Sequence, residues 1–217
     1  MPSRIPLVCA SYVRAFWLII AVIVLMGLQV ATATQQLHQA DERAHASYAT
    51  VLAHGTLPSI DTPMPDEPDR YPRLASMLEG RDSAHREIWV ANHPPLYYLL
   101  SVPLVWAGDA LGQPNVTYVG MRVLNVAGFA ATVVLAALVA GELVPRRRAV
   151  PVLTAGLALS AGAIPYRAGA IYNDGVATAA ASLVLLVALR TVRDGPTRGR
   201  LAALALAGAA AAASRST

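Results

Sequence analysis

The first group of residues able to do chemistry follows directly on the first apolar segment of the chain. His38, Asp41 and His45 are spaced i, i+3 and i+7, so on a helix their side chains would share one face. Such a face can hold a metal ion or arrange a general base. The same spacing is common on ordinary solvated helices, so both interpretations remain open. Asp41 and Glu42 stand just beyond the apolar segment, and carboxylates held at a membrane edge are more often functional than those on a free surface.

A second polar group is the sequence YNDG at residues 172–175, which precedes a later apolar segment. Asp174 would lie at a helix N-terminus, where the helix dipole favours its negative charge. One interpretation is purely structural, with Asn173 or Asp174 as the N-cap. The other makes Asp174 a second carboxylate that faces Asp41 across the mouth of a helix bundle, with Asn173 and His45 as further metal ligands.

Arginine and histidine supply candidate contacts to a phosphate. Arg122 and Arg167 stand at the ends of apolar segments on the side of the membrane where arginine is disfavoured. They either extend to lipid headgroups or clamp a phosphate, which a guanidinium binds with two hydrogen bonds. The segment NHPPLYY at residues 92–98 is the most distinctive string, because its prolines start a helix and its tyrosines are typical interfacial anchors. His93 is thereby held at the membrane surface as a third candidate.

The elements that must position these residues belong to a membrane protein. Of the 217 residues, 55% are hydrophobic and 14% are charged, against roughly 25% charged in a soluble domain. All 17 basic residues are arginines, and they are divided among short loops with no stripe of alternating aromatic residues, which argues against nucleic-acid binding. The single cysteine, Cys9, excludes an intrachain disulfide framework and argues against a zinc ribbon or finger.

The first apolar run, residues 15–33, is uncharged and long enough to cross a hydrocarbon core of about 30 Å. Arg4 and Arg14 precede it and place the N-terminus in the cytoplasm. A cleaved signal peptide is the alternative, because an Ala-Thr-Ala sequence ends the run, but the run is long for such a peptide and favours an uncleaved anchor. In either case segment 34–94 lies outside, and its residues 35–53 are predicted to form a helix.

Residues 96–111 decide the topology. They are too few for a full span and contain Pro103 and Asp109, which predicts a re-entrant or interfacial helix. If they do not cross, the arginines within 146–148 and 190–200 both face the cytoplasm, as the positive-inside bias favours. Four further spans are predicted, at about residues 123–144, 149–164, 176–189 and 201–217.

The predicted fold is all-α, a polytopic transmembrane helical bundle with an extracytoplasmic loop that carries juxtamembrane helices. Its parts are the cytoplasmic N-terminus and first transmembrane helix (1–33), the extracytoplasmic loop (34–121) and the further transmembrane helices (122–217). The last apolar run is short for a crossing, so we expect the chain to be truncated there. Arg215 would then approach Asp41 and Asp174 only if this last helix completed its crossing.

The order of these motifs resembles the GT-C superfamily, whose members are polytopic glycosyltransferases that use polyprenyl-phosphate sugars. The similar features are a first span, Asp-Glu in the outer loop, His-Pro-Pro-Leu-Tyr-Tyr opening a juxtamembrane helix, and a second acidic motif at a later outer turn. Protein O-mannosyltransferases and bacterial lipid A aminoarabinose transferases are examples. The resemblance covers residues 41–215 and implies that Asp41 is the catalytic base, Glu42 its acidic neighbour and Asp174 a ligand of a metal or of the donor phosphate. The chain departs from the family in having fewer spans and no C-terminal extracytoplasmic domain, and Asn173-Asp174 is not the paired-acid motif of the oligosaccharyltransferase branch.

The resemblance implies a bacterial cell-membrane enzyme that transfers a sugar from a polyprenyl-phosphate donor to an extracytoplasmic glycan, lipid or protein hydroxyl, with inversion. Arg122, Arg167 and His93, or a divalent metal ion on Asp174, would stabilise the leaving phosphate, and membrane lipid would surround the spans. Two alternatives remain open: a non-catalytic transporter subunit or assembly factor, and an inactive fragment of the transferase. The nearly charge-free spans favour surface chemistry over transport. As a truncated chain, residues 1–217 alone should insert into a membrane without transferring a sugar.

Overall fold

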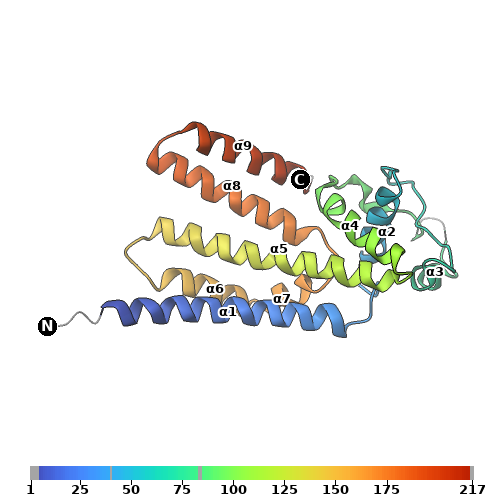
Figure 1. Cartoon of the computed structure of the whole chain (residues 1–217), viewed down its shortest axis with the longest axis horizontal. Coiled ribbons are helices and arrows are strands. Elements are labelled where there is room, and N and C mark those ends of the chain that lie inside the picture. The colour runs from blue at the N-terminus through green and yellow to red at the C-terminus, as the bar shows by residue number, and fades with distance from the viewer. Residues whose placement is uncertain (1–4, 40, 83–84, 216–217) are drawn as a thin grey trace.

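The computed structural model describes residues 5–39, 41–82 and 85–215. Within these ranges the chain is helical with connecting turns and forms no β-strand, so the all-α prediction is confirmed. Figure 1 shows long helices running side by side, with shorter helices gathered at one end. The helices are α1 (Ile5–Ala33), α2 (Glu42–Ala53), α3 (Pro72–Leu78), the 3-10 helix η2 (Trp89–Asn92), α4 (Leu96–Ala110), α5 (Pro114–Leu143), α6 (Val150–Ser160), α7 (Ala163–Ala168), α8 (Asp174–Asp194) and α9 (Arg198–Ala212).

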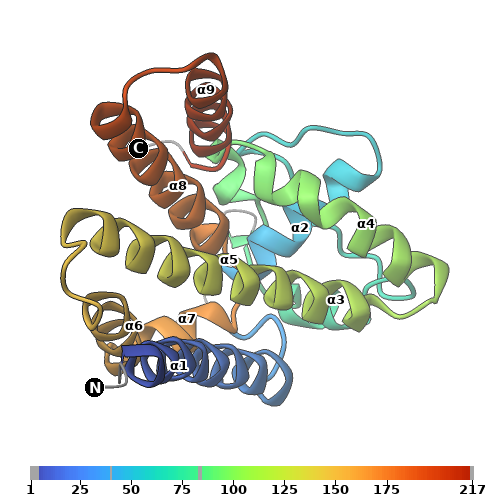
Figure 2. The ribbon, with the colours of Figure 1, turned by 60° about the vertical axis from the view of Figure 1, so that its left-hand side comes forward.

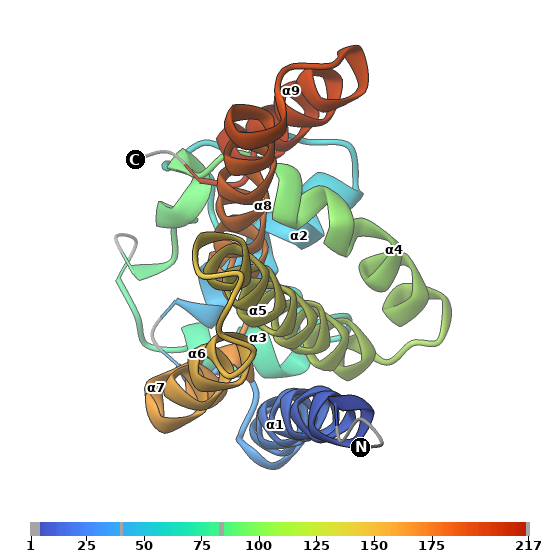
Figure 3. The ribbon, with the colours of Figure 1, turned by 90° about the vertical axis from the view of Figure 1, so that its left-hand side faces the viewer.

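Among the described residues, three helices are long and apolar enough to cross a membrane, which indicates a membrane protein. They are α1 over Ala10–Ala33, α5 and α8. In the end-on view of Figure 3, α5 lies between α1 and α8 and packs against both. Large apolar side chains such as Leu18, Leu25 and Leu185 are exposed on the outside of this bundle, as expected of side chains that face lipid.

Helices α5 and α8 approach each other through two glycines. A Cβ on Gly128 would come within 2.5 Å of the backbone of Gly175, and a Cβ on Gly175 would come equally close to Asn125. Small residues of this kind let helix backbones pack closely in a membrane. The crossing fixes the first turn of α8, which carries Asp174, against α5.

The segment predicted as a span at residues 149–164 is interrupted. Helix α6 has only 11 residues, and a turn at residues 161–162 separates it from α7. The two short helices lie one after the other along α1 (Figure 2). The predicted span ended at residue 164, so it joined α6 to the start of α7, and the apolar sequence there did not reveal the break.

Helix α9 has 15 residues and runs back along α8 from the turn at Gly195, which has a positive φ of 82°. Beyond the end of this helix, the carbonyl of Ala213 accepts a hydrogen bond from Leu96 N at 2.9 Å. The last described residues therefore lie beside the start of α4 (Figure 1). The segment from Gly195 to Arg215 thus runs back along the whole length of α8, and Arg215 pairs with Asp174 at the start of that helix, as expected if this last segment crosses.

The segment predicted as one helix over residues 35–53 is helical only as α2. Leu37 has a left-handed backbone with φ 60°, which interrupts any helix that would start earlier. His38 therefore lies outside α2 and is exposed. The face predicted to be shared by His38, Asp41 and His45 does not form.

The helix predicted over residues 96–111 is observed as α4, whose 15 residues rise about 22 Å and thus fall short of a hydrocarbon core. It packs against α2 and α5. Tyr48, Tyr97 and Tyr98 are buried between these helices and belong to an apolar core that is separate from the bundle interior. We call α2, α3, η2 and α4, with the turns between them, the head. The apolar core of the head fixes the positions of its polar side chains, which include His45 and His93.

Candidate active site at the end of the bundle

A pocket of about 280 Å³ opens where the head meets the start of α8 and the end of α9. Arg215 lines it together with six of the eight side chains predicted as functional from the sequence, which are Asp41, His45, His93, Arg167, Asn173 and Asp174. The polar group after the first span and the polar group before α8 are far apart in the sequence. The fold brings them to one place.

Asp41 supplies a carboxylate at the beginning of α2. It is the N-cap residue, but its side chain makes no capping hydrogen bond. Instead Trp89 Nε1 donates to Asp41 Oδ1 at 3.2 Å. Trp89 begins the short helix η2, so the turn of the head orients this carboxylate at the pocket. A carboxylate has several lone pairs, and one indole donor leaves room for a substrate hydroxyl, as a general base requires.

Asp174 is surrounded by positive charge. It lies in the first turn of α8, and the N-cap position belongs to Asn173. Arg167 Nη1 donates to Asp174 Oδ2 at 3.4 Å, and Arg215 Nη1 donates to Oδ1. The side chain of Asp174 is mostly buried, whereas both arginine side chains are more than half exposed. Each guanidinium has further N–H groups, so the pair can hold an anion in the pocket.

His45 and His93 form an uncharged pair in the pocket wall. Their rings are nearly parallel with centroids 6.1 Å apart, and His45 Nδ1 lies 2.8 Å from the hydroxyl oxygen of Tyr98. Burial lowers the pKa of His45 to about 3. Burial also lowers the pKa of His93, and the nearby charge of Arg215 acts in the same direction. Both imidazoles are therefore neutral at physiological pH, and His93 can offer a phosphate a hydrogen bond but no charge.

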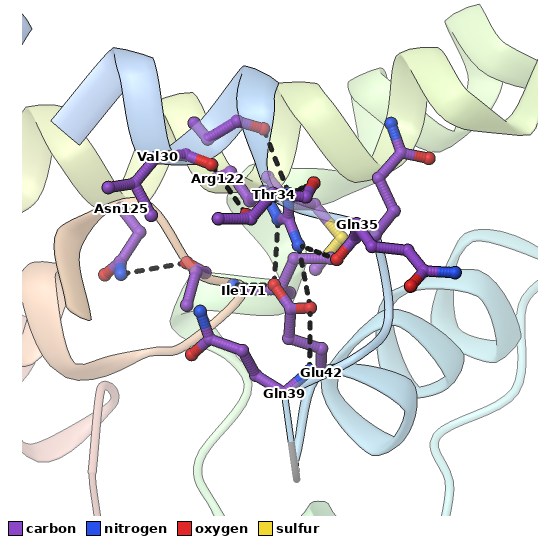
Figure 4. Close-up of polar contacts among 12 residues, drawn as sticks. Val30, Thr34, Gln35, Gln39, Glu42, Arg122, Asn125 and Ile171 are labelled. Atoms are coloured by element: carbon purple, nitrogen blue, oxygen red, sulfur yellow. Dashed lines mark hydrogen bonds and ion pairs between the residues drawn. The ribbon is translucent and has the colours of Figure 1, made fainter. Parts of the chain in front are cut away.

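Glu42 and Arg122 lie outside the pocket, and neither side chain has any exposed surface. Arg122 Nε and Nη2 donate to the two carboxylate oxygens of Glu42 at 2.8 and 2.9 Å (Figure 4). Nη1 donates to the carbonyls of Ala31 and Thr34, and Nη2 to that of Gln35, each at 3.0 Å. These contacts occupy the N–H groups of the guanidinium. The phosphate contact predicted for Arg122 and the catalytic role predicted for Glu42 therefore do not fit this geometry.

Two residues outside the predicted set, Ile171 and Asn125, hold the segment that leads to Asp174 against α2 and α5. Ile171 N donates to Glu42 Oε1 at 2.9 Å. Asn125 in α5 donates through Nδ2 to three backbone carbonyls at the end of α7 and just beyond it, at 3.0 to 3.2 Å, and its Oδ1 accepts from Gly175 N at 2.9 Å. The loop that leads to Asp174 is thus held by α2 and α5 together. An asparagine within an apolar span was the available sequence signal.

The predicted metal site does not fit a divalent cation. In the described parts of the chain, no three His, Cys, Asp or Glu side chains form a group that could hold one. Both oxygens of Asp174 face guanidinium groups, Asn173 donates through Nδ2 to the carbonyl of Ser214 at 3.0 Å, and His45 directs Nδ1 at a tyrosine hydroxyl. The two arginines repel a metal ion and attract an anion.

The pocket thus combines one carboxylate able to accept a proton with two guanidinium groups able to hold a phosphate. The apolar helices behind it bring the site to the end of a membrane bundle. No family model, no curated protein and no solved structure matches the chain.

Proposed function

We propose that this chain is a membrane glycosyltransferase of the GT-C kind, which transfers a sugar from a polyprenyl-phosphate donor to an extracytoplasmic hydroxyl. The observation that carries the proposal is the presence of Asp41, Arg167 and Arg215 in one pocket. The reaction needs a proton acceptor beside the incoming hydroxyl and positive charge beside the leaving phosphate. The pocket offers both.

In the proposed reaction the acceptor hydroxyl gives its proton to Asp41 while its oxygen forms a bond to the anomeric carbon. The bond from that carbon to the phosphate oxygen breaks, and its electron pair leaves with the polyprenyl phosphate. Attack from the side opposite the leaving group inverts the configuration. The leaving group is already a stable anion and needs charge stabilisation more than a proton. Arg167 and Arg215 would supply it through charge-assisted hydrogen bonds.

The place of the pocket supports a donor carried by lipid. Asp174 begins the apolar helix α8, so the two arginines beside it lie at the end of a candidate span, where a phosphate attached to a buried prenyl tail would emerge. In the proposed orientation this end faces the outside. The opposite end carries the arginines of 146–148 and 190–200, which the positive-inside bias places in the cytoplasm.

Replacing Asp41 by asparagine tests the proposal. The variant keeps the shape of the side chain and an acceptor for the Trp89 indole, but it cannot take up a proton. In membranes from cells that express the complete gene, transfer from radiolabelled polyprenyl-phosphate sugars should fall about 100-fold or more, while donor binding is retained. Asp61→Asn is the matched control, because Asp61 is an exposed carboxylate of the head that lines no part of this pocket.

Each outcome bears on a different part of the proposal. Transfer by Asp41→Asn at the wild-type rate would show that this carboxylate is not the base. Arg167→Gln should raise the KM for the donor. An unchanged KM would show that Arg167 does not bind the donor phosphate. Binding of donor without any transfer by the wild-type protein would favour a non-catalytic membrane protein.

A further inference from the structure

A second pocket lies at the opposite end of the bundle, between α1, α5 and the start of α6, and has a volume of about 210 Å³. Its walls are almost entirely carbon, and Arg148 is the only charged residue among the described side chains that line it. The lining includes Phe16, Trp17, Ala137, Arg148, Pro151 and Val152. A pocket of this composition suits a molecule with an apolar body and an anionic end.

In the described part of the chain, no carboxylate neutralises the positive charge around this pocket. Arg14 and the arginines of 146–148 are exposed, and within the described ranges none of them has a carboxylate at ion-pair distance. Nearby arginines of α8 differ, since Arg190 and Arg193 both pair with Glu142. Positive charge is left available on the side of the bundle where the apolar pocket opens.

We propose that this pocket binds an acyl chain of an anionic phospholipid whose phosphate contacts Arg148. A guanidinium binds a phosphate with two hydrogen bonds, and basic pockets between membrane helices bind anionic headgroups. Trp17 is 55% exposed in the pocket wall, as is typical of a side chain at a membrane interface. A free phosphate has no apolar part to bury against the carbon walls, so they would add nothing to its binding free energy. A zwitterionic lipid would be attracted less strongly by the arginine. The inference is independent of the proposed glycosyl transfer, because the two pockets lie at opposite ends of the bundle.

Trp17 provides the measurement. The full chain is reconstituted in phosphatidylcholine vesicles that contain either brominated phosphatidylglycerol or brominated phosphatidylcholine, and quenching of tryptophan fluorescence is recorded. Trp89 and Trp106 also emit, so the same titration on Trp17→Phe is subtracted to isolate the signal of Trp17. Arg148→Gln removes the charge at the pocket. Arg198→Gln removes an arginine at the same end of the bundle that does not line the pocket and serves as the matched control.

Phosphatidylglycerol should quench Trp17 at lower concentration than phosphatidylcholine, and Arg148→Gln should reduce this preference roughly fivefold while Arg198→Gln preserves it. Val152→Phe, which fills the pocket without adding another tryptophan, should weaken quenching by both lipids. Equal quenching by the two lipids in the wild-type protein would overturn the proposal. An equal loss of the preference for phosphatidylglycerol in both arginine variants would also overturn it, because it would indicate a diffuse effect of charge. An absence of quenching by either lipid would overturn it as well, and would indicate that a second copy of the chain covers the pocket.

Discussion

Replacing Glu42 by glutamine isolates the contribution of the buried ion pair. The variant keeps the shape of the side chain and one acceptor oxygen, but it leaves the charge of Arg122 buried without compensation. Breaking a buried pair in this way costs about 3–5 kcal/mol of the free energy of unfolding. Arg122 retains the carbonyls of Ala31, Thr34 and Gln35. We therefore expect the lower end of that range, about 3 kcal/mol.

A double-mutant cycle measures the interaction free energy between Glu42 and Arg122 separately from their contacts with other residues. Arg122→Met alone leaves the Glu42 carboxylate buried and should destabilise the protein by a similar amount. The double variant removes both charges, so its loss should be smaller than the sum of the two single losses by about 2 kcal/mol. Unfolding of the detergent-solubilised protein by heat or denaturant provides the free energies. Glu142→Gln is the control, because its ion pairs involve exposed arginines and its loss should change the free energy of unfolding much less than Glu42→Gln does.

Two results would refute this reasoning. Additivity within about 0.5 kcal/mol would show that Glu42 and Arg122 do not interact as the structure indicates. A Glu42→Gln variant of wild-type stability that lost transfer would show that Glu42 acts in the chemistry rather than in positioning. The expected pattern is the reverse of that for Asp41→Asn, which should lose transfer and keep its stability.

Two further predictions concern topology and pH. Reporter fusions at Glu79 and Asp174 should report the outside of the cell and fusions at Arg147 and Arg198 the inside; an outside signal at Arg147 would mean that α4 crosses the membrane. The folded pKa of His45, about 3, lies below its ordinary value of about 6.5, so its contribution to stability is complete above pH 6.5 and is lost as the pH falls towards 3. The free energy of unfolding should therefore fall by about 2 kcal/mol between pH 7 and pH 5 because of this histidine. If the free energy of unfolding depended on pH equally in His45→Gln and in the wild type, the prediction would be wrong.

The long apolar runs and the short segment at residues 96–111 were predictable, because length and composition alone decide whether a helix can cross a membrane. The meeting of Asp41 and Asp174 was predictable too. Loops on the same side of a bundle have little room to separate. Six of the eight predicted side chains line the pocket for this reason.

The role of Arg122 was not predictable from its neighbours in the sequence. An arginine at the end of a span has the same local pattern whether it faces lipid headgroups or a buried carboxylate. Its partner, Glu42, is 80 residues away, and its other acceptors are the hydroxyl of Thr34 and backbone carbonyls, which carry no sequence signal. The left-handed Leu37, which directs the chain past Arg122, has a side chain that gives no hint of this conformation.

The hydrogen bonds that hold the end of α9 in place involve residues that also line the pocket. Away from this end α9 packs mainly on α8, while at this end Ala213 bonds to Leu96, Ser214 to Asn173 and Arg215 to Asp174. Whatever binds Arg215 must therefore change the free energy that holds the tip of α9. Thermodynamic linkage makes the effect reciprocal, so a force or a partner that displaces α9 changes the affinity of the pocket by the same factor.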